Sequence, residues 1–186
     1  RVDELQIKGG HNVENALAAA SVAYLAGAPA AGMIEVLKSF GGVEHRIEPV
    51  AVIDGVPYYN DSKATNTDSA IKALESFAGH LVFIAGGDDK HTDLADFMAL
   101  VRERTDELIL LGDAAARFKE AALAAGYAPE HIHETGYSME ETVKLAHALA
   151  RPPQTVLLSP ACASFDMYDG YEERGRDFKR LVKALQ

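Results

Sequence analysis

The sequence predicts an α/β protein with a Rossmann-like, mostly parallel sheet that carries helices on both faces. Three observations predict this class. From Ile47 onward, short apolar segments alternate with longer segments of helical pattern. Segments such as 81–85 and 155–159 are almost continuously apolar, as parallel strands covered on both faces are. The Asp54–Gly55 pair between the first two segments predicts one antiparallel hairpin.

The expected elements follow from these patterns and from the turn residues between them. We predict strands near 49–53, 56–60, 81–85, 107–112, 131–134 and 155–159. We predict helices near 66–78, 93–104, 113–125, 138–149 and 170–185.

The first 44 residues differ from the rest. After a polar, strand-like start, an alanine-rich helix is expected at 11–27, ended by Gly27, and a second helix at 30–40. Two short helices form a poor core alone, so we expect this region to pack on structure outside the chain. We place a domain boundary near 43–45, which separates a helical segment, residues 1–44, from an α/β domain, residues 45–186.

Composition excludes several classes of protein. The chain has 186 residues, is 48% hydrophobic and 25% charged, and has a net charge of -10. The negative charge argues against a nucleic acid or an anionic membrane as partner. No apolar run reaches the roughly 18 residues of a membrane-spanning helix. The single cysteine, Cys162, cannot form an intramolecular disulfide, which indicates a cytoplasmic setting.

The loop 60–66 contains the first candidate binding residues. Asp61, Lys63 and Thr65 follow a predicted strand and precede a helix, for which Thr65 and Asp68 suggest a capping box. The start of a helix offers free N–H groups and partial positive charge, and Lys63 adds a full charge, so a carboxylate or phosphate would suit this loop. A capped helix with a surface lysine is the alternative.

Two further loops follow predicted strands. Gly86 and Gly87 would let a ligand approach the backbone, and Lys90 supplies a second cation, although a glycine turn with solvated charges is favoured if this loop stands alone. In the loop 159–170, Ser164 could bind an anion or cap the last helix. Phe165 and Tyr171 could form the wall of a pocket or belong to the core.

Several patterns argue against other chemistry. His131 and His133 lack a third ligand nearby, so no metal site is expected in this chain. Cys162 has no neighbouring base and is expected to be a small buried residue. The sequence contains no phosphate-binding Gly-x-x-x-x-Gly-Lys-[Ser/Thr] motif. The residues that bind the terminal phosphates of any ATP would therefore lie outside this chain.

Five segments together resemble the carboxyl-terminal part of the Mur ligase family, whose members add amino acids to the peptidoglycan precursor. The segments are 10–15, 42–46, 60–66, 86–90 and 159–175, and they occur in the family's order over nearly the whole chain. The segments 61–66 and 159–164 most resemble the members that add D-glutamate. Tyr171 departs from the phenylalanine expected in many relatives, which preserves a wall but adds a hydroxyl.

The resemblance implies a function and roles for residues. Residues 1–44 would be the end of a central ATP-binding domain, and residues 45–186 the amino-acid-binding domain. The whole enzyme would use ATP and Mg²⁺ to join D-glutamate to UDP-N-acetylmuramoyl-L-alanine through an acyl phosphate. The main phosphate and Mg²⁺ ligands would lie in the missing domains, so the fragment alone is expected to be inactive. The residues implied for D-glutamate are Lys63, Thr65, Lys90, Ser164, Phe165 and Tyr171, and those for the nucleotide are Asn12, Asn15, Arg46 and Asp61.

None of these residues resembles a general base, so their contribution would be orientation and charge compensation. Two alternatives stay open from the sequence. One is a related ligase for L-alanine, a diamino acid or folate polyglutamate. The other is an α/β binding or interaction module without catalysis.

Overall fold

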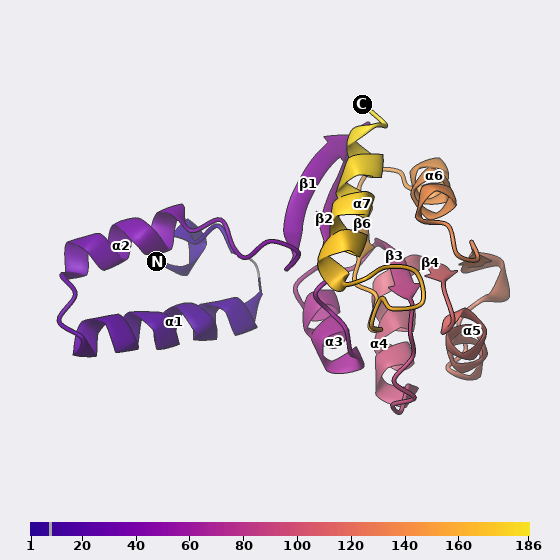
Figure 1. The fold of residues 1–186 in the computed structure, drawn as a ribbon, viewed down its shortest axis with the longest axis horizontal. Coiled ribbons are helices and arrows are strands. Elements are labelled where there is room, and N and C mark those ends of the chain that lie inside the picture. Colours follow the sequence, from indigo (N-terminus) through magenta and orange to yellow (C-terminus); the bar gives the residue numbers. More distant parts are fainter. Residues whose placement is uncertain (8) are drawn as a thin grey trace. The chain divides into compact units, whose positions relative to one another are not determined.

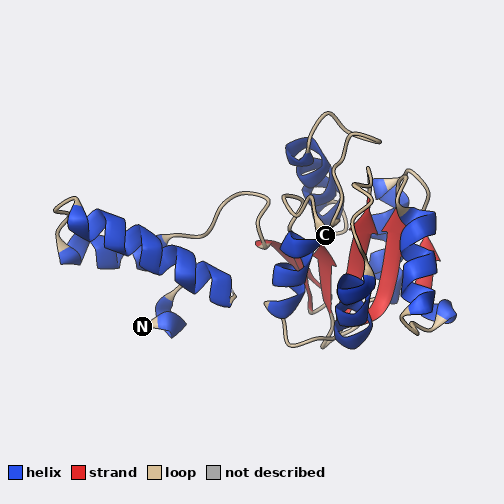
Figure 2. Cartoon of the chain, turned by 90° about the horizontal axis from the view of Figure 1, so that it is seen from below, coloured by secondary structure: helices blue, strands red, loops and turns tan. Residues whose placement is uncertain are grey.

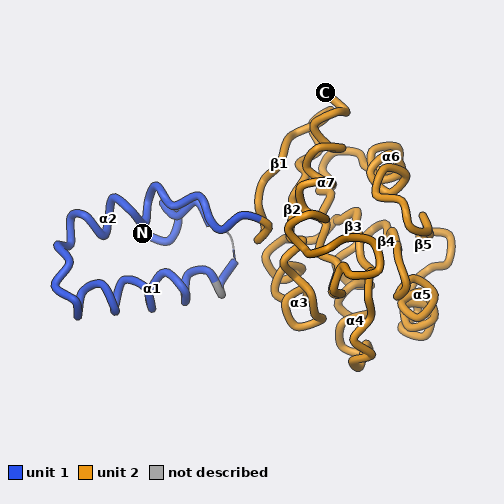
Figure 3. The backbone as a smooth tube through the Cα atoms, in the orientation of Figure 1, with its two compact units in different colours: residues 1–44 blue, residues 45–186 orange. Residues whose placement is uncertain are grey.

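The computed structural model describes residues 1–7 and 9–186, without the side chain of His11. The chain divides into two compact units, residues 1–44 and 45–186, which are coloured separately in Figure 3.

Unit 1, residues 1–44, is helical. It contains the 3-10 helix η1 (Val2–Glu4) and the helices α1 (Gly10–Leu25) and α2 (Ala30–Ser39). The expectation of a strand-like start was therefore wrong, because Val2–Glu4 form a single tight turn whose backbone bond runs from Glu4 N to Arg1 O over 3.1 Å.

The apolar side chains of unit 1 remain accessible. Alanines of α1 face Pro29, Gly32 and Met33 across a groove of about 400 Å³. No hydrophobic side chain is fully buried among the residues described in 1–44. The exposed large ones are Val2, Leu17, Val22, Tyr24, Leu25, Ile34, Val36, Phe40 and Val43.

Unit 2, residues 45–186, is an α/β domain around a six-stranded sheet in the order β1-β2-β6-β3-β4-β5. Its strands are β1 (Glu48–Ile53), β2 (Val56–Asn60), β3 (Leu81–Gly86), β4 (Thr105–Leu111), β5 (Ile132–Glu134) and β6 (Thr155–Leu158). Its helices are α3 (Thr67–Glu75), α4 (Ala95–Arg104), α5 (Ala115–Ala124), α6 (Met139–Leu149) and α7 (Tyr171–Lys183), with the 3-10 turn η2 at Pro129–His131. Figure 1 labels most of these elements.

The sheet is parallel except for one pair. Strands β1 and β2 are antiparallel, with Ile53 opposite Val56. Their turn places Asp54 at φ 49° and Gly55 at φ 81°, the left-handed geometry that tight hairpins need. Strands β2, β6, β3, β4 and β5 run parallel, so the predicted fold class is confirmed.

The sheet separates two hydrophobic layers, because side chains of a strand alternate between its faces. In β3, Phe83 packs with α3, α4 and α5, whereas its neighbours Val82 and Ile84 pack with α6 and α7. Figure 2 shows helices on both sides of the strands. In the described part of the chain, no helix is long and apolar enough to cross a membrane.

Candidate functional site

The candidate site lies where the carboxyl ends of three neighbouring strands meet. Strands β2, β6 and β3 are parallel neighbours, with β6 in the centre. Their carboxyl ends therefore point to the same edge (Figure 1), which is where open α/β sheets bind ligands. The loops that leave this edge are 61–66, 87–94 and 159–170, the same loops that the sequence singles out.

Backbone hydrogen bonds join these loops. Asp61 N donates to Leu158 O over 2.7 Å, and Gly86 N donates to Pro160 O over 2.9 Å. Asp88 and Ala163 exchange bonds of 3.0 and 3.1 Å. The three loops singled out by the sequence thus lie together, whereas the roles of their side chains stay predictions.

Close backbone packing at this edge requires glycine. Gly87 has φ 130°, and a Cβ there would lie 2.4 Å from Ala163 O. Gly86 has φ 120°, and a Cβ there would meet Leu111 O at 2.0 Å. These glycines hold β3 and its loop against neighbouring backbone, which is a structural requirement independent of any ligand.

Arg174, on α7, is the main side-chain link between two of the loops. It is 2% exposed and donates to the Oγ and O atoms of Ser62, each over 2.9 Å. It also donates to Ala163 O over 2.9 Å and to Cys162 O over 3.0 Å. Burial lowers the pKa of Arg174 to about 10, which leaves it charged at neutral pH. The loops 61–66 and 159–170 are therefore fixed by a buried cation.

Lys63 and Tyr171 form a pair at the surface. Lys63 Nζ donates to the hydroxyl of Tyr171 over 2.9 Å and lies 4.6 Å from the centre of its ring. The Tyr171 ring also makes an edge-on contact with His45, with centroids 6.0 Å apart. These contacts hold the Lys63 ammonium in one place. Because Lys63 is exposed, its ammonium also remains accessible to an anion.

The other predicted D-glutamate residues differ in accessibility. Ser164 is 2% exposed and Phe165 is 71% exposed. Thr65 is half-buried and Lys90 is exposed. Ser164 does not cap the last helix, because the N-cap of α7 is Gly170 and the carbonyl of Ser164 instead accepts from Met167 and Tyr168.

The start of α3 differs from the predicted capping box. Asn66 is the N-cap, and its side chain accepts from Ser69 N over 2.8 Å. Thr65 therefore lies outside the helix. Asparagine adopts the cap readily because its short side chain reaches the third N–H of the helix.

Asp61, predicted to contact the nucleotide, is 4% exposed. Its carboxylate accepts from Ile47 N over 3.1 Å and from Ser159 Oγ over 2.7 Å. Burial raises its pKa to about 7, and these hydrogen bonds oppose that shift only in part. In this structure Asp61 fixes the start of unit 2 to the end of β6, while Arg46 beside it is exposed.

The remaining predicted nucleotide residues lie on α1 of unit 1. Asn12 is 9% exposed, and Asn15 is exposed. Asn15 Nδ2 lies 3.4 Å from Asn12 Oδ1, so the pair occupies one side of the first turns of the helix.

The two histidines near β5 pair with a carboxylate. His131 Nδ1 lies 2.9 Å and His133 Nε2 lies 2.7 Å from oxygens of Glu107. Among the described residues, no cluster of three or more histidine, cysteine or acidic side chains could hold a metal ion. Cys162 is 1% exposed, and burial raises the pKa of its thiol to about 12, which makes a nucleophilic thiolate unfavourable.

Sequence reasoning missed three residues that build the site. They are Asn60, Ser159 and Arg174. Asn60 Nδ2 contacts His45 Nδ1 over 2.9 Å and donates to Glu48 Oε2 over 3.0 Å. The position of Asn60 and Ser159 at strand ends was the available signal, but their partners are distant in sequence.

The fold and the site together define a Rossmann-like domain with a candidate anion site at the carboxyl edge of its sheet. The family described as "Mur ligase, glutamate ligase domain" matches residues 45–162. The chain belongs to this family.

Curated relatives extend the match to the whole chain. A UDP-N-acetylmuramoylalanine–D-glutamate ligase of Symbiobacterium thermophilum is 50% identical over 99% of this chain. The ligase of the same name from Clostridioides difficile is 41% identical over 99% of the chain. The chain spans about 40% of the length of each of these relatives.

Solved structures share the fold at low identity. The UDP-N-acetylmuramate–alanine ligase MurC of Thermotoga maritima matches 98% of this chain and 40% of its own, with a TM-score of 0.71 and 18% identity. A Mycobacterium tuberculosis folylpolyglutamate synthase matches 85% of this chain and 39% of its own, with a TM-score of 0.67 and 18% identity. These structures support the fold, and they do not distinguish between substrates.

Proposed function

We propose that this chain is the carboxyl-terminal part of an ATP-dependent ligase that joins D-glutamate to UDP-N-acetylmuramoyl-L-alanine. Relatives named for this reaction, 41–50% identical to almost the entire chain, support the choice of amino acid. Residues 45–186 would be the amino-acid-binding domain, and residues 1–44 the end of a central ATP-binding domain. The reaction would take place in the cytoplasm, where ATP and nucleotide-linked sugars are made.

The geometric observation that carries the proposal is the junction of loops bearing Lys63 and Lys90. D-Glutamate has two carboxylates, so a site for it needs more than one cationic or N–H donor. The loops of Lys63 and Lys90 are both tied to the loop of Ser164, through Arg174 and the Asp88–Ala163 pair respectively. Such a frame suits a small dianion.

Each candidate residue receives a role consistent with its exposure. Lys63 and Lys90 would neutralise the two carboxylates, and Thr65 with Ser164 would donate hydrogen bonds. Phe165 and Tyr171 would form the apolar wall. Since Ser164 is buried, its hydroxyl would donate to the ligand from the floor of the site.

The nucleotide would bind with help from Asn12, Asn15, Arg46 and Asp61. Asn12 and Asn15 would contact adenine, and Arg46, which is exposed, would contact the phosphates or ribose. The covered carboxylate of Asp61 favours an indirect role, in which it fixes the backbone beside Arg46. ATP and Mg²⁺ would be the cofactors of the whole enzyme. The main Mg²⁺ ligands would lie in the other domains of the whole enzyme.

The reaction would proceed in two steps. The substrate carboxylate attacks the terminal phosphorus of ATP, which gives an acyl phosphate and ADP. The amine of D-glutamate then attacks the acyl carbon, phosphate leaves, and the nitrogen loses a proton as the amide forms. The residues of this chain would hold the amine near the acyl carbon, which accelerates the second step by orientation rather than by proton transfer.

A substrate panel tests the proposal. The full-length protein is incubated with ATP, Mg²⁺ and UDP-N-acetylmuramoyl-L-alanine, together with D-glutamate, L-glutamate, L-alanine or a diamino acid. We expect ADP release and a new UDP-linked product only with D-glutamate. Turnover with another amino acid, or of folate with glutamate, and none with D-glutamate would refute it.

A further inference from the structure

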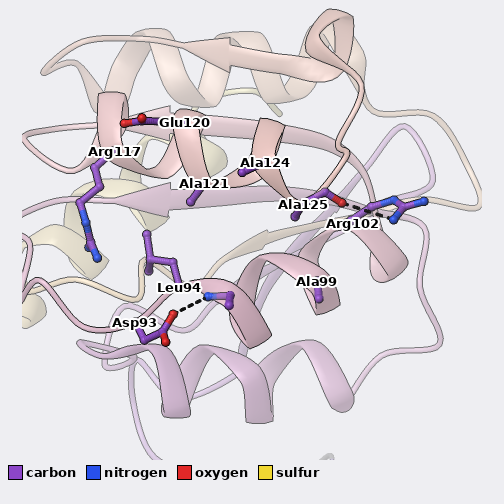
Figure 4. A pocket seen from close by; sticks show the side chains of 10 residues that line it. Asp93, Leu94, Ala99, Arg102, Arg117, Glu120, Ala121, Ala124 and Ala125 are labelled. Atoms are coloured by element: carbon purple, nitrogen blue, oxygen red, sulfur yellow. Dashed lines mark hydrogen bonds between the residues drawn. The ribbon is translucent and has the colours of Figure 1, made fainter.

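The loop 87–94 has a second anchor besides the Asp88–Ala163 pair. Arg117, on α5, donates from Nη1 to both carboxylate oxygens of Asp89, over 2.8 and 3.1 Å. Its Nη2 donates to the carbonyl oxygen of Thr92. One guanidinium therefore contacts the loop on both sides of Lys90. In Figure 4, Arg117 extends from α5 toward the segment of Asp93 and Leu94.

Asp89 is itself held by the loop. His91 N donates to Asp89 Oδ1 over 2.8 Å, and His91 has φ 55°, a left-handed conformation that only a fixed local structure maintains. On the other side, Ala114 N donates to Gly87 O over 2.9 Å. Lys90 is thus exposed in a loop whose backbone is fixed before and after it.

Because its carboxylate is largely covered, this ion pair should contribute substantially to holding the loop 87–94 in place. The Asp89 side chain is 9% exposed and that of Arg117 is 36% exposed. Exposed ion pairs contribute little, but a charge-assisted pair with a largely covered carboxylate is stronger. Removing the arginine would leave Asp89 covered and without its cation.

We propose that Arg117 is a positioning residue, which holds the 89–92 backbone so that Lys90 presents its ammonium to a carboxylate of the amino-acid substrate. This inference rests on the proposed function. Without this anchor, the loop and the lysine would have to become ordered when the substrate binds. That ordering costs free energy, so the substrate would bind more weakly. The effect would fall on binding of the amino acid and not on the nucleotide.

The first test compares Arg117→Met with Arg102→Met in the full-length ligase. Arg102 lines the same groove between α4 and α5 and donates to Ala125 O over 3.3 Å, away from the loop 87–94 (Figure 4). We expect Arg117→Met to raise the KM for D-glutamate roughly tenfold, with kcat and the KM for ATP within about twofold, and Arg102→Met to leave all three unchanged. Equal KM values for D-glutamate in Arg117→Met and wild type would overturn the inference.

A double-mutant cycle with Lys90→Met separates positioning from general stability. If Arg117 acts through Lys90, Arg117→Met has no further effect on the KM for D-glutamate once Lys90 is methionine. Additive effects would show that Arg117 acts by another route. Absence of D-glutamate turnover in the wild type would instead refute the proposed function, while leaving the loop measurement below intact.

Hydrogen exchange provides a readout that does not depend on ligase activity. In the full-length protein we expect faster exchange of the amides at 89–92 in Arg117→Met than in Arg102→Met, with α5 unchanged. Unchanged exchange at 89–92 would show that Arg117 does not hold this loop. Faster exchange throughout α5 would show a general structural role, which also contradicts the proposal.

Discussion

At the scale of single residues, Lys63 combines an exposed ammonium with a fixed position. Its Nζ is held by the hydroxyl of Tyr171 at 2.9 Å. If Lys63 binds a carboxylate of D-glutamate, as proposed, replacing it with alanine should remove one charge-assisted contact, on the order of 1.5–3 kcal/mol. We therefore expect the KM for D-glutamate to rise roughly 10- to 150-fold in the full-length enzyme.

The melting temperature of Lys63→Ala should stay near that of the wild type, since an exposed lysine contributes little to folding. Lys72→Ala, an exposed lysine on α3 paired with Glu75, is the matched control and should change neither property. A parallel loss of activity and melting temperature would identify Lys63 as a structural residue.

Asp61 should make stability depend on pH. Burial raises its pKa from 3.8 to about 7. Between these values the folded state holds a proton that the unfolded state has lost, so the free energy of unfolding falls as the pH rises through this range. Asp61→Asn removes this titration and retains an acceptor for Ile47 N.

We expect the difference in unfolding free energy, variant minus wild type, to increase between about pH 4 and pH 8, on the order of a few kcal/mol. Urea unfolding at several pH values measures it. A flat difference for Asp61→Asn between about pH 4 and pH 8 would contradict the prediction.

At the scale of elements, α7 approaches the end of β2 closely because it contains a glycine. A Cβ on Gly175 would lie 2.2 Å from His45 Nδ1 and 3.1 Å from Asn60 Nδ2. In the middle of a solvent-exposed helix, alanine stabilises the helix by about 1 kcal/mol relative to glycine. Here we expect the opposite: Gly175→Ala should lower the melting temperature by several degrees, because α7 must move away from His45.

Gly32→Ala is the control for helix propensity. Gly32 lies in α2, where an added Cβ meets only Pro29 Cγ, at 3.8 Å. We expect it to leave the melting temperature unchanged or slightly raised in a thermal unfolding experiment. A Gly175→Ala variant as stable as the wild type would contradict this prediction, because it would show that His45 and Asn60 can move aside without loss of stability.

The sequence predicts those features of the elements that depend on near neighbours. Apolar runs such as Leu81–Gly86 identify strands, and Asp54–Gly55 identifies the hairpin. It does not predict contacts between distant segments: Arg174 bonds Ser62 over 112 positions, and no local pattern identifies that partner. The cap at Asn66 instead of Thr65 shows the same limit at short range, since either side chain suits the position.

At the scale of the whole molecule, the two units differ in their ability to fold alone. Every fully buried hydrophobic side chain among the described residues lies at or beyond Ile47. Residues 45–186 surround the sheet with a hydrophobic layer on each face. The described residues of unit 1 bury no such side chain, and helices as short as α1 and α2 are marginal in water without packing.

We therefore expect residues 45–186 to unfold cooperatively in urea, with a melting temperature within about 3 °C of that of residues 1–186. A peptide of residues 1–44 should show only partial helicity that declines gradually on heating. Circular dichroism of the three chains measures both properties. If removal of residues 1–44 abolished the cooperative transition, the core of unit 2 would be insufficient by itself. If the longer protein that we propose supplies packing partners for residues 1–44, Leu17→Asp and Val22→Asp should destabilise that protein while leaving residues 1–186 nearly unchanged.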